Sequence, residues 1–211
     1  MEPQQKNYLT IAEYLQVEKD TGVRYEYHDG MIQAMAGGSY DHTTISGNIY
    51  SELRIKLRSR KNNGDGGSRK CVASSENRKI YIPSKNLFLY PDASVVCGVP
   101  ERTPQEPGAV TNPTLIAEVL SKSTEGRDPE STAGGDKFHL YCLLPTFQEY
   151  LLIQQYRVAV EVRTKTKDGS WKITAIEGVG QTIELSSLNI SLSIEALYED
   201  TQDLSEFLNK S

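Results

Sequence analysis

The sequence lacks the features of a membrane protein, a secreted protein or a strongly basic nucleic-acid binder. None of its apolar runs approaches the roughly 20 residues that a membrane helix needs. Residues 1–6 contain no apolar stretch of the kind found in signal peptides. The net charge is −5, whereas proteins that depend on non-specific DNA contacts are usually basic. We therefore expect a cytoplasmic protein without a membrane segment, in which any contacts with nucleic acid are confined to a local basic face.

Cysteine is also scarce, with three in 211 residues. Cys71, Cys97 and Cys142 are odd in number and widely spaced, which fits neither a disulfide framework nor a zinc knuckle. We interpret all three as reduced structural thiols, as is usual in the cytoplasm.

The first forty residues predict a short helix followed by a hairpin. Thr10 and Glu13 form a capping-box pattern, which indicates the start of the helix. Asp29-Gly30 is a turn signal, and the strands that it joins are expected at 24–27 and 31–36.

Residues 42–60 predict the longest helix. Apolar residues recur every four positions along it and form one stripe, which consists of Ile45, Ile49, Leu53 and Leu57. A second face carries Arg54, Arg58 and Lys61, and this face is our candidate for contacts with a phosphate backbone. A solvated amphipathic helix is the plainer interpretation of the same charges.

Most of the remaining chain predicts strands. The apolar run 114–120 is broken only by Glu118, and such a run suits a strand covered on both faces. The proline-containing segment 99–112 predicts an exposed loop, and a helix is expected at 136–144. We predict one α/β (α+β) domain with a mixed central sheet flanked by helices, spanning 1–211 with a core at about 10–200. Further strands are expected at 70–75, 79–82, 87–90, 93–97, 149–154, 158–164, 171–176, 182–185 and 188–192, and a small closing helix at 193–198.

Two acidic residues, Asp92 and Glu118, occupy positions where an apolar or a strand-paired residue would be expected. Glu118 interrupts a buried strand, and a buried carboxylate is costly unless a cation or hydrogen bonds compensate for it. Asp92 follows Pro91, which prevents continuous ladder pairing. Two converging carboxylates can hold a divalent cation, and a nearby lysine such as Lys137 can stabilise negative charge. A salt bridge at Glu118 and a turn aspartate at Asp92 remain as structural alternatives.

Four runs of the sequence, at 25–30, 91–96, 118–124 and 136–141, carry a further pattern. Together they resemble the Uma-type restriction endonuclease family, which belongs to the PD-(D/E)XK nuclease superfamily. The resemblance covers roughly residues 10–153, and run 118–124 is its most specific part. It implies a restriction endonuclease-like core, to which the remaining C-terminal hairpins would be additions.

The resemblance also implies a site. Asp92 and Glu118 correspond to metal ligands, for Mg²⁺ or Mn²⁺, and Glu26 to an additional acid. The superfamily usually places its lysine two residues after the second acid, where this chain has Leu120. In the Uma-type family the lysine lies on the following helix instead, and Lys137 matches it.

Two further residues complete the expected site. The main-chain carbonyl of Val119 is a candidate third metal ligand. His42, at the start of the long helix, is a candidate for orienting a phosphate or an acid, although a histidine at a helix start is more often a surface residue. His28 and His139 are expected to be structural.

The sequence therefore predicts a metal-dependent endonuclease that hydrolyses phosphodiester bonds in DNA, with a homodimer expected by analogy. The principal alternative is a catalytically inactive nuclease-fold protein that binds nucleic acid or a protein partner, which the absent lysine at Leu120 and the acidic charge favour. An enzyme acting on RNA or a small phosphorylated molecule is another, because fold alone does not fix the substrate. A structural or assembly protein is the remaining alternative.

Overall fold

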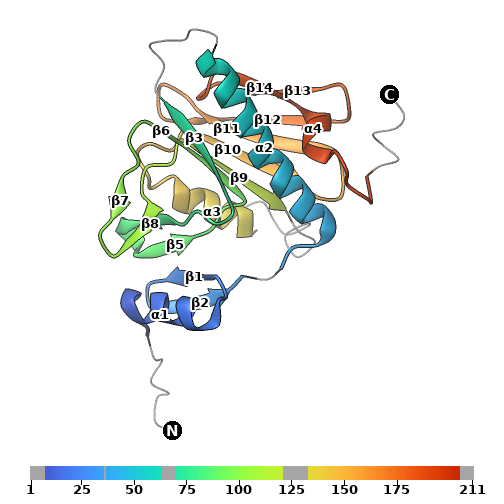
Figure 1. Cartoon of the computed structure of the whole chain (residues 1–211). Coiled ribbons are helices and arrows are strands. Elements are labelled where there is room, and N and C mark those ends of the chain that lie inside the picture. Colours follow the sequence, from blue (N-terminus) through green and yellow to red (C-terminus); the bar gives the residue numbers. More distant parts are fainter. Residues whose placement is uncertain (1–7, 36, 63–69, 121–132, 205–211) are drawn as a thin grey trace.

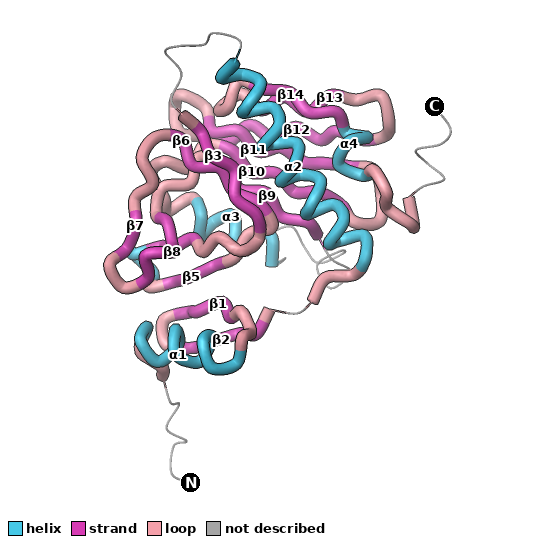
Figure 2. Tube along the Cα trace, viewed as in Figure 1, coloured by secondary structure: helices cyan, strands magenta, loops and turns pink. Residues whose placement is uncertain are grey.

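The computed structural model describes residues 8–35, 37–62, 70–120 and 133–204, without the side chains of 61–62 and 133–136. Figures 1 and 2 show a long helix, α2 (Tyr40–Asn62), lying across one face of a sheet. A shorter helix, α3 (Ala133–Tyr141), lies behind that sheet. Across the described residues, no helix has the length and apolar character needed to span a membrane.

The sheet under α2 has six strands in the order β12-β11-β10-β9-β6-β3. Its strands β9 and β10 are parallel neighbours and are connected through α3, whereas every other neighbouring pair is antiparallel. The expected mixed sheet flanked by helices is thereby confirmed. The bounds are β3 Cys71–Ser75, β6 Ala93–Cys97, β9 Leu115–Leu120, β10 Glu149–Gln154, β11 Ala159–Lys165 and β12 Trp171–Glu177.

A second six-stranded sheet, in the order β2-β1-β5-β4-β8-β7, was not expected from the sequence. The predicted exposed loop at 99–112 is wrong, because this segment contains two strands of that sheet. Its prolines are accommodated because the β7–β8 pair is short and irregular at the end of the sheet. The bounds are β1 Tyr25–His28, β2 Met31–Ala34, β4 Ile80–Ile82, β5 Leu87–Leu89, β7 Arg102–Thr103 and β8 Glu106–Val110.

The remaining elements are small. A hairpin of β13 (Thr182–Leu185) and β14 (Ile190–Ser193) leads into α4 (Ile194–Tyr198). A 3-10 turn, η1 (Pro83–Lys85), connects β4 to β5.

Alternating residues on the central strands face two different cores. On β9, Leu115, Ala117 and Val119 belong to the apolar cluster under α2, together with the predicted helix stripe from Ile45 to Leu57. Ile116, between them, belongs to the cluster that contains Phe138 and Tyr141 of α3. Since side chains alternate along a strand, Glu118 shares the face of Ile116 and points toward α3.

The N-terminal segment forms a small lobe made of α1 (Ile11–Thr21) and the β1–β2 hairpin (Figure 1). The capping box is confirmed, since Thr10 Oγ1 accepts from the Glu13 N–H at 3.2 Å and Glu13 Oε2 accepts from the Thr10 N–H at 2.7 Å. The hairpin turn is confirmed as well, with Asp29 and Gly30 at φ +46° and +99°. These angles are those that a tight two-residue turn requires.

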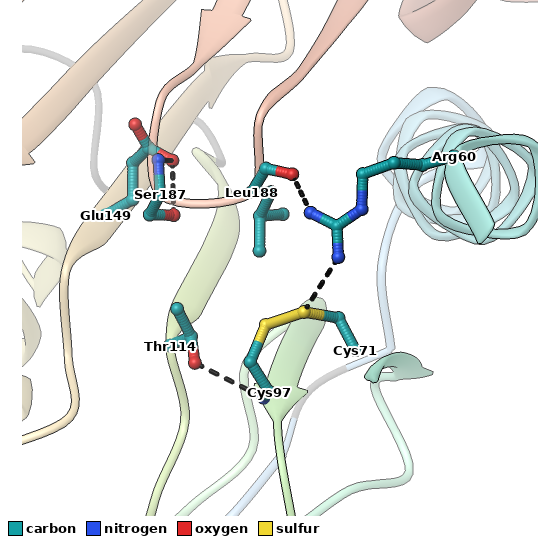
Figure 3. The surroundings of a disulfide bond; sticks show 7 residues. All are labelled: Arg60, Cys71, Cys97, Thr114, Glu149, Ser187 and Leu188. Carbon is teal, nitrogen blue, oxygen red and sulfur yellow. Dashed lines mark hydrogen bonds between the residues drawn. A yellow bond between two sulfur atoms is a disulfide. The ribbon is translucent and has the colours of Figure 1, made fainter. Parts of the chain in front are cut away.

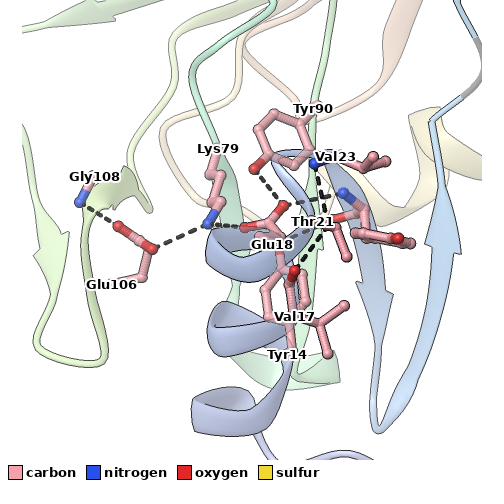
Figure 4. Close-up of polar contacts among 10 residues, drawn as sticks. Tyr14, Val17, Glu18, Thr21, Val23, Lys79, Tyr90, Glu106 and Gly108 are labelled. Carbon is pink, nitrogen blue, oxygen red and sulfur yellow. Dashed lines mark hydrogen bonds and ion pairs between the residues drawn. The ribbon is translucent and has the colours of Figure 1, made fainter.

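A partly buried ionic network fastens this lobe to the rest of the protein (Figure 4). Lys79 lies between Glu18 of α1, at 2.5 Å, and Glu106 of β8, at 3.0 Å. Glu18 also accepts hydrogen bonds from the Tyr90 hydroxyl at 2.8 Å and from the Tyr25 N–H at 3.0 Å. The network therefore ties β1 to the chain immediately before Pro91.

The prediction that all three cysteines are reduced is wrong for two of them. Cys71 and Cys97 form a disulfide between β3 and β6, and Arg60 reaches toward Cys71 (Figure 3). They stand directly opposite each other in the strand register, 4.0 Å apart between Cα atoms. Their separation of 26 residues concealed this pairing, because no short spacing rule applies to it. Cys142 is free, and burial raises the pKa of its thiol.

Candidate active site

Asp92 and Glu118 converge because of the register between β6 and β9. Ala93 pairs with Ala117 in this antiparallel ladder, so the residues just beyond them, Asp92 and Glu118, come from facing positions. The N–H of Val119 donates to Asp92 Oδ2 at 2.7 Å and fixes this carboxylate at the end of the ladder. Both acids lie largely away from water, and Glu118 is only 8% exposed.

Helix α3 brings a lysine and a tyrosine to Glu118. Lys137 Nζ lies 3.6 Å from Glu118 Oε1, and the Tyr141 hydroxyl donates to the same oxygen at 3.1 Å. The two residues are four positions apart and therefore lie on one face of the helix. The structure thus places Lys137 beside the acids. Lys137 lies on α3, whereas Leu120, at the usual lysine position, lies on β9.

Strand β1 contributes Glu26, which the predicted hairpin places opposite Gln33. Glu26 Oε1 lies 2.8 Å from Lys137 Nζ, so the lysine bridges Glu26 and Glu118. His28 Nε2 lies 3.6 Å from the other oxygen of Glu26. His28 therefore belongs to the cluster, although the sequence analysis treated it as structural. Its position two residues from Glu26, on the same side of a strand, was the available signal.

The first two turns of α2 reach Asp92. His42 Nε2 lies 3.7 Å from Asp92 Oδ2, and the Ser46 side chain, one turn later, hydrogen-bonds to the same carboxyl group. Gly38 lies against the imidazole, since a Cβ at that position would come within 2.6 Å of His42 Nδ1. His42 thus lies where it can orient an acid, and Ser46 is a contact that the sequence analysis missed.

Burial and mutual repulsion govern the ionisation of the three acids. Burial raises the pKa of Glu118 to about 8, Lys137 opposes this shift, and the carboxylates of Asp92 and Glu26 add to it. Burial also raises the pKa of Asp92, against the effect of His42. For Glu26, burial favours the neutral form, but contacts with His28 and Lys137 outweigh it and lower the pKa to about 2.

The neighbouring carboxylates also shift the pKa of Lys137. Burial alone would lower the pKa of its ammonium group, but Glu118 and Glu26 raise that pKa above its ordinary value. Lys137 therefore stays charged. Glu26 and Glu118 thus share one lysine, and the described ion-pair partner of Asp92 is His42.

The donor set fits a hard divalent cation. Carboxylate and carbonyl oxygens are the ligands of Mg²⁺, which commonly binds through one or two carboxylates and retains several waters. Asp92, Glu118 and the Val119 carbonyl offer such oxygens, and the raised pKa of Glu118 shows that burial and the neighbouring carboxylates disfavour its charged form when no cation is bound. Within the described residues, no three His, Cys, Asp or Glu side chains are already arranged around a common metal position. Waters or substrate would therefore have to complete the coordination.

The basic residues of α2 lie apart from the acids. Arg54 and Arg58 are exposed and, with Lys70, line a groove of about 310 Å³ between α2 and β3. The Arg54 guanidinium donates to the Tyr50 hydroxyl at 2.7 Å. Arg54 follows His42 by twelve residues, a distance of about 18 Å along the helix axis. The side chain of Lys61 lies outside the described residues.

Comparisons with known proteins agree with this architecture. The family model Uma2, described as "Putative restriction endonuclease", matches residues 11–196. Two proteins of Synechocystis sp. (strain PCC 6803) are similar, both called uncharacterized. One, slr1290, is 34% identical over 190 residues, covering 90% of this chain and 91% of that protein. The other, sll1609, is 35% identical over 182 residues, covering 86% and 95%.

A solved structure is similar in fold. It is the crystal structure of a "putative nuclease belonging to DUF820" from Anabaena variabilis ATCC 29413, with a TM-score of 0.63. The similarity covers 90% of this chain and 97% of that one, at 18% sequence identity. At that identity the comparison establishes the fold alone.

Proposed function

The chain belongs to the Uma2 restriction endonuclease-like family, and from that membership we propose that it is a metal-dependent endonuclease that hydrolyses phosphodiester bonds in DNA. The observation that carries the proposal is the convergence of Asp92, Glu118 and Lys137. Asp92 directly precedes β6, Glu118 lies on β9 and Lys137 on α3, and the three meet at one end of the central sheet. A fold without chemistry has no need of several buried acids at one place.

In this proposal Asp92, Glu118 and the Val119 carbonyl would hold Mg²⁺ or Mn²⁺. The ion, when bound, would supply Lewis acidity toward a phosphate and lower the pKa of a bound water. The ammonium group of Lys137 stabilises the negative charge that develops on the phosphate in the transition state. Glu26 keeps Lys137 charged and in place through its 2.8 Å contact.

His42 and Ser46 act on Asp92. Their contacts, with the N–H of Val119, surround this carboxylate and hold it in one orientation. Catalytic groups held by such supporting contacts stay close to productive geometry. His42 is therefore assigned to positioning rather than to proton transfer.

DNA as the substrate, a homodimeric assembly and a cytoplasmic location are parts of the proposal that rest on family membership and analogy. Arg54 and Arg58, with Lys61, are proposed to contact the phosphate backbone, and Arg54 lies about 18 Å from His42 along the axis of α2. The Cys71–Cys97 disulfide weighs against a reducing compartment. Measuring its redox state in protein from freshly lysed cells tests the location.

A second candidate function is a nuclease-fold module that binds nucleic acid or a protein without cutting. Two observations favour it: the superfamily position at Leu120 lacks its lysine, and Lys137 lies closer to Glu26 than to Glu118. Binding of DNA without any cleavage in Mg²⁺ or Mn²⁺ would favour this candidate.

The test is cleavage of supercoiled plasmid, linear duplex and RNA by metal-free protein to which Mg²⁺ or Mn²⁺ is added back. Asp92→Asn, Glu118→Gln and Lys137→Met should each lose at least about 10²-fold in rate, as is usual when a transition-state contact is removed. Glu177→Gln, on an exposed part of β12, serves as the matched carboxylate control. Cleavage that persists in the presence of a chelator contradicts the metal assignment.

A further inference from the structure

Tyr141 places a buried hydroxyl at the acid cluster, and the proposed function assigns it no role. The side chain is 0% exposed, and its hydroxyl donates to Glu118 Oε1 at 3.1 Å. Lys137, one helical turn earlier, approaches the same oxygen at 3.6 Å. Both contacts that the Glu118 carboxylate makes with described residues therefore go to Oε1.

The Tyr141 ring is held by its aromatic neighbours. Its centroid lies 5.9 Å from the Phe147 ring and 6.1 Å from the Tyr150 ring, within the apolar core between α3 and the central sheet. A ring packed on two sides cannot swing its hydroxyl away from Glu118 without disturbing that core.

A glutamate needs such a restraint to be a good metal ligand. The last torsion of a glutamate side chain is broad, so an unrestrained carboxylate samples many orientations. A donor fixed by packing selects one of them before a ligand arrives, which reduces the cost of binding.

We propose that Tyr141 is a positioning residue for the metal: by holding Oε1 of Glu118 against α3, it keeps Oε2 available to a divalent cation shared with Asp92. This inference rests on the proposed function, because it assumes that Asp92 and Glu118 bind a metal. It extends that function by naming what orients Glu118. Tyr141 touches neither substrate nor metal, so it is not a catalytic residue.

The test compares Tyr141→Phe with Tyr198→Phe. Tyr198 is equally buried, at 0% exposed, and its hydroxyl is hydrogen-bonded to main-chain atoms of Gln154 and Ala159, far along the chain from the acid cluster. Both variants lose one buried hydroxyl, but only Tyr141→Phe should alter metal binding. Calorimetric titration of Mn²⁺ or Mg²⁺ into metal-free protein should show an affinity about 3- to 10-fold weaker for Tyr141→Phe, as expected for one hydrogen bond. Tyr198→Phe should retain the wild-type affinity even where it melts at a lower temperature.

A second variant keeps the Tyr141 hydroxyl and loosens the packing around the Tyr141 ring. Phe147→Leu removes one of the two aromatic contacts, and a smaller weakening of metal affinity in the same direction is expected. This variant serves where Tyr141→Phe does not fold. If the wild type cleaves DNA, saturating metal should return the Tyr141→Phe rate to near the wild-type value, which the loss of a catalytic group would not permit.

The outcomes separate the two proposals. Unchanged metal affinity in Tyr141→Phe overturns the inference and leaves the proposed function intact. Weaker affinity in a protein that cleaves no nucleic acid supports the inference and contradicts the nuclease assignment. No metal binding by the wild type overturns both.

Discussion

Two clusters in this protein place a lysine between two glutamates, yet they differ in burial and in the number of acids that the lysine must balance. Lys79 lies 2.5 Å from Glu18 and 3.0 Å from Glu106, and Glu18 is further satisfied by the hydroxyl of Tyr90 and the N–H of Tyr25. Each glutamate there has close donors. That cluster, shown in Figure 4, fastens the N-terminal lobe to the rest of the fold.

The cluster around Lys137 has a third acid. Lys137 lies 2.8 Å from Glu26 and 3.6 Å from Glu118, and Asp92 lies on the adjacent strand end. Burial, together with the repulsion of its neighbours, raises the pKa of Glu118 to about 8. A lysine between two glutamates is therefore not enough to mark a metal site. What distinguishes the Lys137 cluster is a third acid close to a buried glutamate, whose charged form is costly unless a cation or a proton compensates for it.

Removing each lysine in turn should have the largest and most different effects on the two clusters. Lys137→Met should lower the rate of DNA cleavage by about 10²- to 10³-fold, because it removes the cation assigned to the transition state. Lys79→Met, assayed below its melting temperature, should cleave within a few-fold of the wild type. Single-turnover rates at saturating Mg²⁺ measure both. Equal losses in the two variants would show that the clusters do not differ in function.

The free energy of unfolding should show the opposite pattern and depend more on Lys79 than on Lys137. Lys79→Met leaves two partly buried carboxylates without their lysine, and the free energy of unfolding should fall by about 3 kcal/mol. Lys79→Arg is the control, since it keeps the charge. Urea unfolding of the metal-free proteins measures the change. If Lys79→Met were as stable as the wild type, this network would not be what fastens the N-terminal lobe.

The pH dependence of stability should identify Glu118. Its folded-state pKa, about 8, lies above the ordinary value of 4.5. The folded state therefore binds this proton more tightly than the unfolded state does, and stability should fall as pH rises from about 4.5 to about 8. Glu118→Gln should remove most of that decline and be more stable than the metal-free wild type at pH 8 by about 4 kcal/mol.

The control for this prediction is added metal. Mg²⁺ bound at the acids stabilises the charged form of Glu118, so saturating Mg²⁺ should flatten the wild-type profile but leave Glu118→Gln unchanged. Parallel profiles for the two metal-free proteins between pH 4.5 and 8 would contradict the raised pKa. Glu26 contributes in a different window, since its pKa of about 2 gives stability that is lost only as pH falls below about 4.5.

The smallest expected effect concerns metal affinity without Lys137. The ammonium group lies among the same carboxylates that would hold the metal, and like charges repel. Lys137→Met, although inactive, should therefore bind Mg²⁺ about tenfold more tightly than the wild type. Calorimetry measures this, with Lys79→Met as the control of unchanged affinity. Weaker binding by Lys137→Met would mean that Lys137 supports the metal site instead of competing with it.

The sequence predicted what depends on local patterns and motif order. The capping box at Thr10, the turn at Asp29-Gly30 and the apolar stripe of α2 use short-range rules, and the structure confirms them. The proximity of Lys137 to Glu118 was available from the family resemblance. Its physical cause is the β9–α3–β10 crossover, which returns the chain over the same sheet.

What the sequence did not reveal depends on pairings between distant residues. The Cys71–Cys97 disulfide, the contact between Lys79 and Glu18, and the approach of Ser46 to Asp92 each require two elements to be placed first. Strands β7 and β8 were missed for a related reason. Proline excludes a central strand but not the end of a sheet, and position in a sheet is a tertiary property.

The most direct test of the account is metal binding by the acid pair. Metal-free wild type and the Asp92→Ala/Glu118→Ala double variant would be titrated with Mn²⁺ and Mg²⁺ by calorimetry, after circular dichroism has shown that both are folded. The account predicts binding to the wild type that is absent from the double variant. Equal binding by both proteins would contradict it, because the cation would then be held by residues other than Asp92 and Glu118.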